Sequence, residues 1–151
     1  MDQLDYRLVI ELQENSRRSN RQIARVLGVS ETTVRRRIDS LIGSKTIKLA
    51  AIPDPVKLGY PTYAFFHLQV DLSKIDSVAE ALASYSQVLL VNSCSGTSQL
   101  MVSAIFRSPA ELADFVTDEL GKIEGIIRTE TTMHLKFIKR TLGWVQHDSN
   151  I

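Results

Sequence analysis

The chain has 151 residues, of which 44% are hydrophobic and 23% charged, and its formal net charge is +1. This composition is typical of one or two small folded domains and excludes long disorder. No run of about eighteen apolar residues occurs, and the polar start does not resemble a secretory signal, so we expect no membrane association. The single cysteine excludes an internal disulfide. We therefore expect a cytoplasmic protein without a metal or cofactor.

The charge is unevenly divided along the sequence. Residues 1–60 contain 11 Lys/Arg and 7 Asp/Glu, a net charge of +4, whereas residues 61–151 contain 7 Lys/Arg and 10 Asp/Glu, a net charge of −3. A basic segment suits a polyanion such as DNA. The asymmetry is modest, so it only supports what the motifs indicate.

The first 42 residues predict three short helices. An apolar residue recurs every four positions from Leu4 to Leu12, which gives the first helix one apolar stripe, and Asp2 is its expected N-cap. The second helix is expected to begin at Ser19, because Gln22 follows it at the spacing of a capping box.

The spacing of Ala24, Gly28 and Val34 is typical of a helix-turn-helix. The small Ala24 lets two helices cross closely, Gly28 suits the left-handed backbone of a tight turn, and Val34 fills the wedge between the helices. Ser30 then caps a third helix, whose inner face runs from Val34 to Leu41. In such a motif the third helix enters the major groove of DNA.

The outward face of the third helix predicts the residues that contact base edges. With about 100° per residue and Val34 pointing inward, Thr32 lies at about 160° and Arg36 at about 200°. Arginine bonds guanine bidentately and a threonine methyl contacts thymine, so these two are our candidates. The phosphate candidates lie on the helix flanks and on neighbouring elements: Ser30, Thr33, Arg35, Arg17, Arg18 and Arg21. Arg37 is expected either to contact DNA or to pair with Asp39 or an acid of the first helix.

After residue 47 the pattern changes. Two proline-containing turns within ten residues predict a linker over residues 48–61. A strand, helix, strand, strand, helix, strand order follows, with these expected bounds: strands 63–70, 88–94, 99–106 and 127–138, and helices 75–84 and from Ser108. The sequence therefore predicts an α+β protein. A three-helix, winged-helix-like domain spans residues 1–47, and a ferredoxin-like βαββαβ domain spans residues 62–151.

Together these motifs resemble the Lrp/AsnC (feast/famine) family of bacterial and archaeal transcriptional regulators. The resemblance covers nearly the whole chain and rests on these residues: Leu4, Asp5, Leu8, Glu11, Leu12, Gln13, Arg17, Ile23, Ala24, Gly28, Val29, Ser30, Thr33, Val34, Arg37, Ile38, Leu41, Ile47, Asp54, Pro55, Leu58 and Gly59. It implies a homodimer formed through the ferredoxin-like sheets, often assembled as an octamer of four dimers on symmetric half-sites of double-stranded DNA. It also implies a small effector, in many members an amino acid.

One hairpin departs from the family pattern. Where the family has Gly-x-x-Asp, whose carboxylate helps to hold the effector's ammonium group, this chain has Gly96, Thr97, Ser98 and Gln99. An amide lacks the charge that an ammonium group prefers, so we expect either a different ligand or none. The resemblance assigns hydroxyls of the last strand to the same pocket: Thr129, Thr131 and Thr132. Ordinary β-branched strand residues would give the same pattern.

The end of the third helix is a second departure. The family usually has a glycine shortly after this helix, where this chain has Lys45. We therefore expect Gly43 to take over as the cap of the helix.

Several functions remain to be compared. A nucleoid-associated, sequence-specific regulator agrees with all the motifs. The alternatives are a weakly specific architectural DNA-binding protein and a ligand-sensing assembly module without strong DNA binding. An enzyme is not expected, because the sequence has no Gly-rich phosphate loop, no nucleophile motif and no paired acid–histidine constellation.

Overall fold

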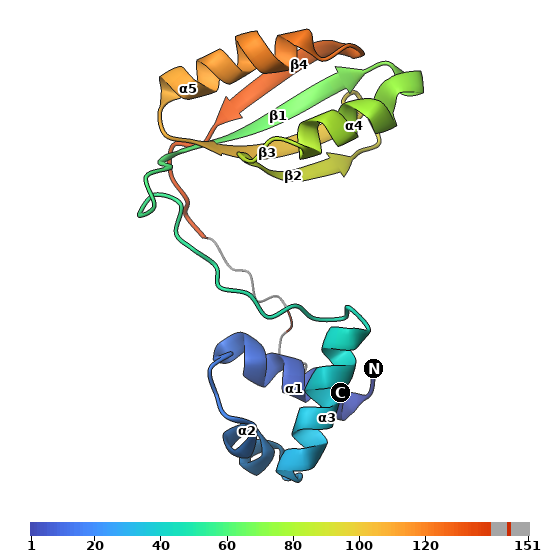
Figure 1. The fold of residues 1–151 in the computed structure, drawn as a ribbon, viewed down its shortest axis with the longest axis vertical. Coiled ribbons are helices and arrows are strands. Elements are labelled where there is room, and N and C mark those ends of the chain that lie inside the picture. The colour runs from blue at the N-terminus through green and yellow to red at the C-terminus, as the bar shows by residue number, and fades with distance from the viewer. Residues whose placement is uncertain (140–144, 146–151) are drawn as a thin grey trace. The chain divides into compact units, whose positions relative to one another are not determined.

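The computed structural model describes residues 1–139 and residue 145. These residues form two compact units (Figure 1): residues 1–52 with Lys139 and Val145, and residues 53–138. The linker expected over residues 48–61 thus contributes to both units. The end of the expected second domain, residues 140–144 and 146–151, lies outside the described residues. Within the described part of the chain, no helix is long and apolar enough to cross a membrane.

Three helices build the first unit. Their bounds are α1 Gln3–Glu14, α2 Asn20–Leu27 and α3 Glu31–Gly43. Each expected N-cap is confirmed, because the side chains of Asp2, Ser19 and Ser30 each accept a hydrogen bond from the backbone N–H three residues on. The helices enclose one apolar core: Leu8, Val9, Leu12, Ile23, Ala24, Leu27, Val34 and Leu41.

A four-stranded antiparallel sheet with helices builds the second unit, as the βαββαβ pattern predicts. Its main elements are β1 Thr62–Val70, α4 Ile75–Ala83, β2 Val88–Ser93, β3 Leu100–Phe106, α5 Pro109–Asp114 and β4 Ile126–Met133. Short turns of 3-10 or π helix at Leu72–Lys74, Phe115–Glu119 and Leu120–Lys122 extend the helical segments. The strand order is β2-β3-β1-β4, which confirms the ferredoxin-like arrangement.

The sheet buries one face. Alternate residues of β1 and β3, such as Phe66 and Phe106, are fully buried beneath α4 and α5, which lie on the same side of the sheet (Figure 1). No helix of residues 1–139 covers the other face (Figure 1). There Tyr63, Phe65 and His67 of β1 remain half-exposed.

The last strand is shorter than expected. β4 ends at Met133, which lies opposite Ala64, and one further backbone hydrogen bond runs from the N–H of His134 to the carbonyl of Tyr63 at 2.8 Å. The alternating apolar pattern of the sequence continues to Phe137, beyond the end of the paired strand. Met133 and Phe137, which regular alternation along one strand would put on the same face, lie on different faces. The ring of Phe137 packs on Tyr63 at the open face, with centroids 5.4 Å apart, whereas the partner of Met133 points into the core.

The end of α3 differs in part from the expectation. Gly43 is the last helical residue, but Ser44 is the cap and Gly43 does not adopt a left-handed backbone. Lys45 does so instead, at φ 58°. Lys45 therefore adopts the left-handed conformation that glycine usually adopts after a helix.

Candidate nucleic-acid interface

The turn between α2 and α3 has the geometry that the spacing predicts. Gly28 ends α2 in the left-handed region at φ 71° and ψ 32°. The backbone N–H groups of Gly28 and Val29 both donate to the carbonyl of Ala24. A Cβ on Gly28 would meet no atom within 4 Å, so the backbone conformation favours glycine here, and lack of space does not. Ala24 and Val34 are both buried between the helices.

The outward face of α3 is open to solvent. Thr32 and Arg36 are both exposed, as the helical wheel predicts. Arg36 forms no salt bridge with any residue that the structure describes. Its guanidinium group is therefore available to an external acceptor.

Two of the expected phosphate contacts are partly engaged in capping α3. Ser30 Oγ accepts from the backbone N–H of Thr33 at 3.1 Å, and the two hydroxyl oxygens lie 2.8 Å apart. These bonds hold the N-terminus of α3 in place. The positive end of the helix dipole lies there, where a phosphate is favoured.

Arg37 has partners on α1. Its Nη1 lies 2.7 Å from Asp2 Oδ2 and 3.1 Å from Asp5 Oδ1. The hydrogen bond from the backbone N–H of Asp5 holds the pKa of Asp2 below its ordinary value; desolvation opposes this shift, and Arg37 adds to it. The hydrogen bond to Asp2 in turn raises the pKa of Arg37. Of the alternatives left open by the sequence, the geometry brings Arg37 to acids at the start of the first helix.

Arg18 is also paired within the protein. Its guanidinium bonds Glu11 and Glu14, the latter at 3.2 Å. Glu11 is buried, and a buried carboxylate needs a cationic partner. Sequence reasoning missed this pair, since the two residues belong to different segments and nothing in the local pattern marks Glu11 as buried.

The remaining expected arginines differ in their surroundings. Arg35 lies 3.7 Å from Glu31 in an exposed pair that contributes little. Arg17 and Arg21 are exposed and form no salt bridge within the described residues. Sequence reasoning overlooked Arg25, which is also exposed and lies one turn after Arg21 on α2. That spacing of four residues places both on one side of the helix.

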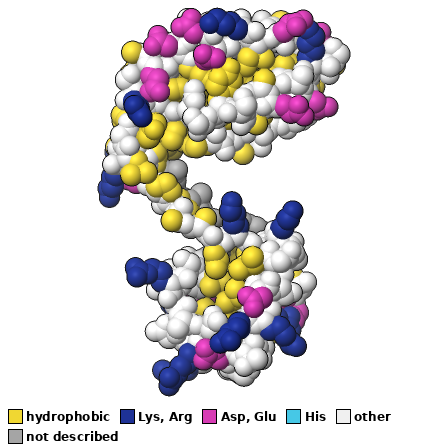
Figure 2. All heavy atoms as spheres, in the orientation of Figure 1, with side chains coloured by type: hydrophobic (Ala, Val, Ile, Leu, Met, Phe, Trp, Pro, Cys, Tyr) yellow, Lys and Arg dark blue, Asp and Glu magenta, His cyan; other side chains and the backbone are white. Residues whose placement is uncertain are grey.

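Figure 2 shows the charge of each unit on one face. Lys and Arg side chains are spread over the visible surface of the first unit, and Asp and Glu are frequent on that of the second. The charge division of the sequence is therefore also a division between the two folded units.

The hairpin residues expected to hold an effector lie at the start of β3. Gln99 uses its amide within the hairpin: Oε1 accepts from the backbone N–H of Val70 at 2.9 Å, and Nε2 donates to the carbonyl of Gly96 at 3.3 Å. Gly96 has φ 119°, and Thr97 beside it is exposed. Ser98 is half-exposed. The side chain of Gln99 thus fastens the turn to the end of β1.

The threonines of β4 do not share one face. Thr129 and Thr131 lie opposite Leu68 and Phe66, on the side of the sheet that the helices cover. Thr132 lies opposite Phe65 and points to the open side. The structure therefore brings Thr129 near the end of β1 that Gln99 fastens, and it separates Thr132 from the other two.

Comparisons with known proteins give a family match for each of the two units. The family model of the AsnC-type helix-turn-helix domain matches residues 1–42, and that of the Lrp/AsnC ligand binding domain matches residues 63–144. An uncharacterized HTH-type transcriptional regulator of Pyrococcus furiosus is 40% identical over 88% of this chain and 90% of its own. The HTH-type transcriptional regulator FL11 of Pyrococcus horikoshii is 33% identical over 93% of each chain. The structure of AsnC of E. coli superposes with a TM-score of 0.86 at 26% identity, over 94% of this chain and 97% of that one.

Proposed function

The chain belongs to the Lrp/AsnC family of helix-turn-helix transcriptional regulators, and we propose that the outward face of α3 reads the operator. Exposed Arg36 is the observation that carries this proposal. It lies on α3, which is capped at Ser30 and buried through Val34 and Leu41, and it forms no salt bridge with any described residue. Because the helix is already formed, no backbone ordering has to accompany its entry into a major groove.

The candidate residues divide into three groups in this proposal. Thr32 and Arg36 contact base edges. The phosphate contacts come from the start and flanks of α3 and from the segment before it: Ser30, Thr33, Arg35, Arg17 and Arg21. Arg18 and Arg37 act as positioning residues, because their guanidinium groups are paired with α1. Residues 1–47 are then the DNA-binding domain, residues 48–61 the linker and residues 62–151 the assembly and effector domain.

Assembly through the open face of the sheet follows from its composition. Tyr63, Phe65, His134 and Phe137 stack there with ring centroids 4.8 to 5.6 Å apart. Exposure of these apolar rings to water is unfavourable, so burying the face against another surface lowers the free energy. We propose a homodimer through this face and an octamer of four dimers, since one short reading helix gives too little specificity alone.

The effector of this protein differs in chemistry from a free amino acid in our proposal. The neutral Gln99 replaces the carboxylate that an ammonium group prefers, and its amide is already bonded to Val70 and Gly96. Calorimetry with the twenty amino acids should detect no binding to the wild type, whereas Gln99→Asp should create binding. Tight binding of an amino acid to the wild type would contradict this assignment.

Gel shifts at fixed salt test the regulator function. The probes are a fragment of the protein's own promoter and a scrambled duplex of the same composition. A sequence-specific regulator prefers the promoter strongly, an architectural protein shows little preference, and a sensing module without DNA affinity shifts neither. We expect the first result, from a nucleoid-associated protein of the cytoplasm with no catalytic step.

A further inference from the structure

The side chain of Gln13, on the last turn of α1, forms a pair of hydrogen bonds to the backbone of a single residue far along the chain. Gln13 Nε2 donates to the carbonyl of Val145 at 2.9 Å, and the N–H of Val145 donates to Gln13 Oε1 at 3.2 Å. A primary amide that both donates to and accepts from one residue imitates the pairing of an adjacent β-strand. It therefore recognises extended main chain, whatever its side chain.

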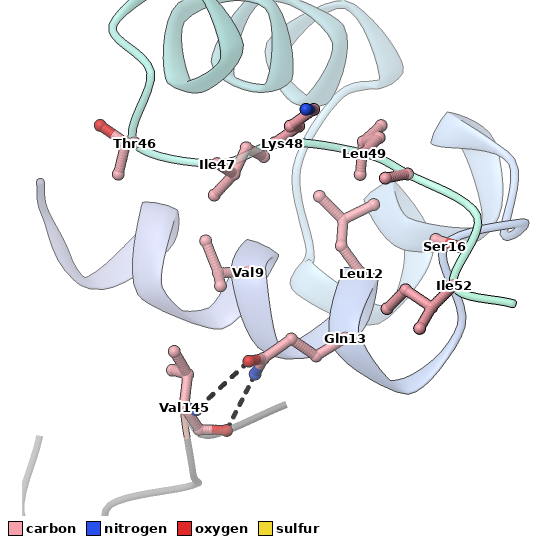
Figure 3. A pocket seen from close by; sticks show the side chains of 11 residues that line it. Val9, Leu12, Gln13, Ser16, Thr46, Ile47, Lys48, Leu49, Ile52 and Val145 are labelled. Atoms are coloured by element: carbon pink, nitrogen blue, oxygen red, sulfur yellow. Dashed lines mark hydrogen bonds between the residues drawn. The ribbon is translucent and has the colours of Figure 1, made fainter. Parts of the chain in front are cut away.

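Beside Gln13, a groove of about 380 Å³ has mainly apolar walls. Val9 and Leu12 of α1 line one side, and residues 46–50 and Ile52 line the other, as Figure 3 shows. Val145 lines the groove too and packs against the core of the first unit. Apolar contact thus adds to the two hydrogen bonds.

The residues that line the groove belong to the first unit and come from segments both before and after the second unit in sequence. Residues 46–52 lead out of the first unit into residues 53–138, and Val145 follows that second unit in sequence. Both contact α1. α1 is joined to α3 through the shared core and through Arg37 with Asp2 and Asp5.

We propose that this groove is a docking site for the C-terminal segment of the protein, with Gln13 binding its main chain at Val145. The docked segment gives the DNA-binding unit a second attachment to the assembly unit, beside the linker. A change in the assembly unit then acts on α1 at two points instead of one. This proposal goes beyond the reading of DNA by α3 and does not depend on it.

Amide hydrogen exchange of the full-length protein tests the proposal without DNA. Gln13→Ala removes both hydrogen bonds, so the Val145 amide should exchange roughly fivefold faster than in the wild type. Gln3→Ala, a change of the same type at the exposed start of the same helix, should leave that rate unaltered. Far-UV circular dichroism of both variants checks that the helices remain folded.

The only tryptophan of the sequence provides a second readout, because Trp144 directly precedes Val145. Quenching of its fluorescence by acrylamide should rise in Gln13→Ala and in Val145→Asp, and should stay at the wild-type level in Gln3→Ala. The proposal fails if the Val145 amide of the wild type exchanges at the rate of an unstructured peptide. It also fails if Gln13→Ala changes neither the exchange nor the quenching.

Discussion

At Lys45 the backbone adopts a conformation that side chains with a Cβ usually avoid. Its φ of 58° lies in the left-handed region, directly after α3. Glycine adopts this region without steric cost. The free energy saved in the folded state exceeds the stabilisation of the unfolded chain by the greater conformational freedom of glycine. We predict that Lys45→Gly raises the free energy of unfolding by about 0.5–1 kcal/mol. Urea denaturation measures it.

Lys48→Gly provides the matched control, because Lys48 is exposed nearby and has no positive φ. There the greater freedom of unfolded glycine is not offset, so stability should fall or stay unchanged. Equal effects at the two positions would show that the left-handed backbone at Lys45 costs nothing.

Asp2 is the residue through which acid should weaken the first unit. Its pKa is lowered below the ordinary 3.8 by the N–H of Asp5 and by Arg37. A lowered pKa means that its stabilising contribution is fully present above the unfolded value and is lost as pH falls through the folded value. Asp2→Asn keeps a capping side chain but no charge. The variant should therefore lose less stability than the wild type between about pH 5 and about pH 2.5.

Thermal unfolding at the two pH values measures this difference. Parallel losses of stability in wild type and variant would mean that Asp2 titrates alike in the folded and unfolded chains.

The roles of the arginines show where sequence reasoning at single residues ends. The outward direction of Arg36 follows from the helical period alone and agrees with the structure. The partners of Arg18 and Arg37 do not follow from the helical period, because Glu11 and Asp2 come within reach of them only after the helices pack. Charge runs therefore overestimate the number of cations left for DNA.

Among the elements, the open face of the sheet determines assembly in our account. Phe65 lies near the middle of this face, between Ser103 of β3 and Thr132 of β4. We predict that Phe65→Glu prevents dimer formation, because a carboxylate would be desolvated in the paired sheets without a partner. Analytical ultracentrifugation should show a smaller species at the concentration at which the wild type is an oligomer.

Leu72→Glu is the control for Phe65→Glu, since Leu72 is 74% exposed in the turn that follows β1. It should assemble as the wild type does. An oligomer that survives Phe65→Glu would exclude the open face as the interface.

The helices of the first unit could be predicted closely from the sequence, and β4 could not. Ser19 with Gln22 and the stop at Gly28 act within a few residues, so local sequence determines where these helices begin and end. The length of β4 depends on its pairing with β1: the alternation of apolar residues continues to Phe137, but the paired residues end at Met133 opposite Ala64. The amide bonds of Gln99 likewise require Val70 to be beside it, which only the folded sheet achieves.

In our proposal, DNA reading and assembly belong to different units of the molecule. The basic unit presents α3 and its free Arg36, and the acidic unit presents the aromatic sheet face. In our proposal two copies joined through that face bind two symmetric half-sites, whose centres lie roughly 34–36 Å apart or a multiple of that distance.

Selection of preferred duplexes from a random library, with full-length wild type, Arg36→Ala and Arg35→Ala at one salt concentration, tests the central claim most directly. The account predicts that the wild type enriches a symmetric two-part motif. Arg36→Ala should lose preference at one or two base pairs of each half-site, at roughly 1–3 kcal/mol per contact, while Arg35→Ala weakens all duplexes alike. A wild type that enriches no motif, or an Arg36→Ala variant that weakens every duplex equally, would contradict it.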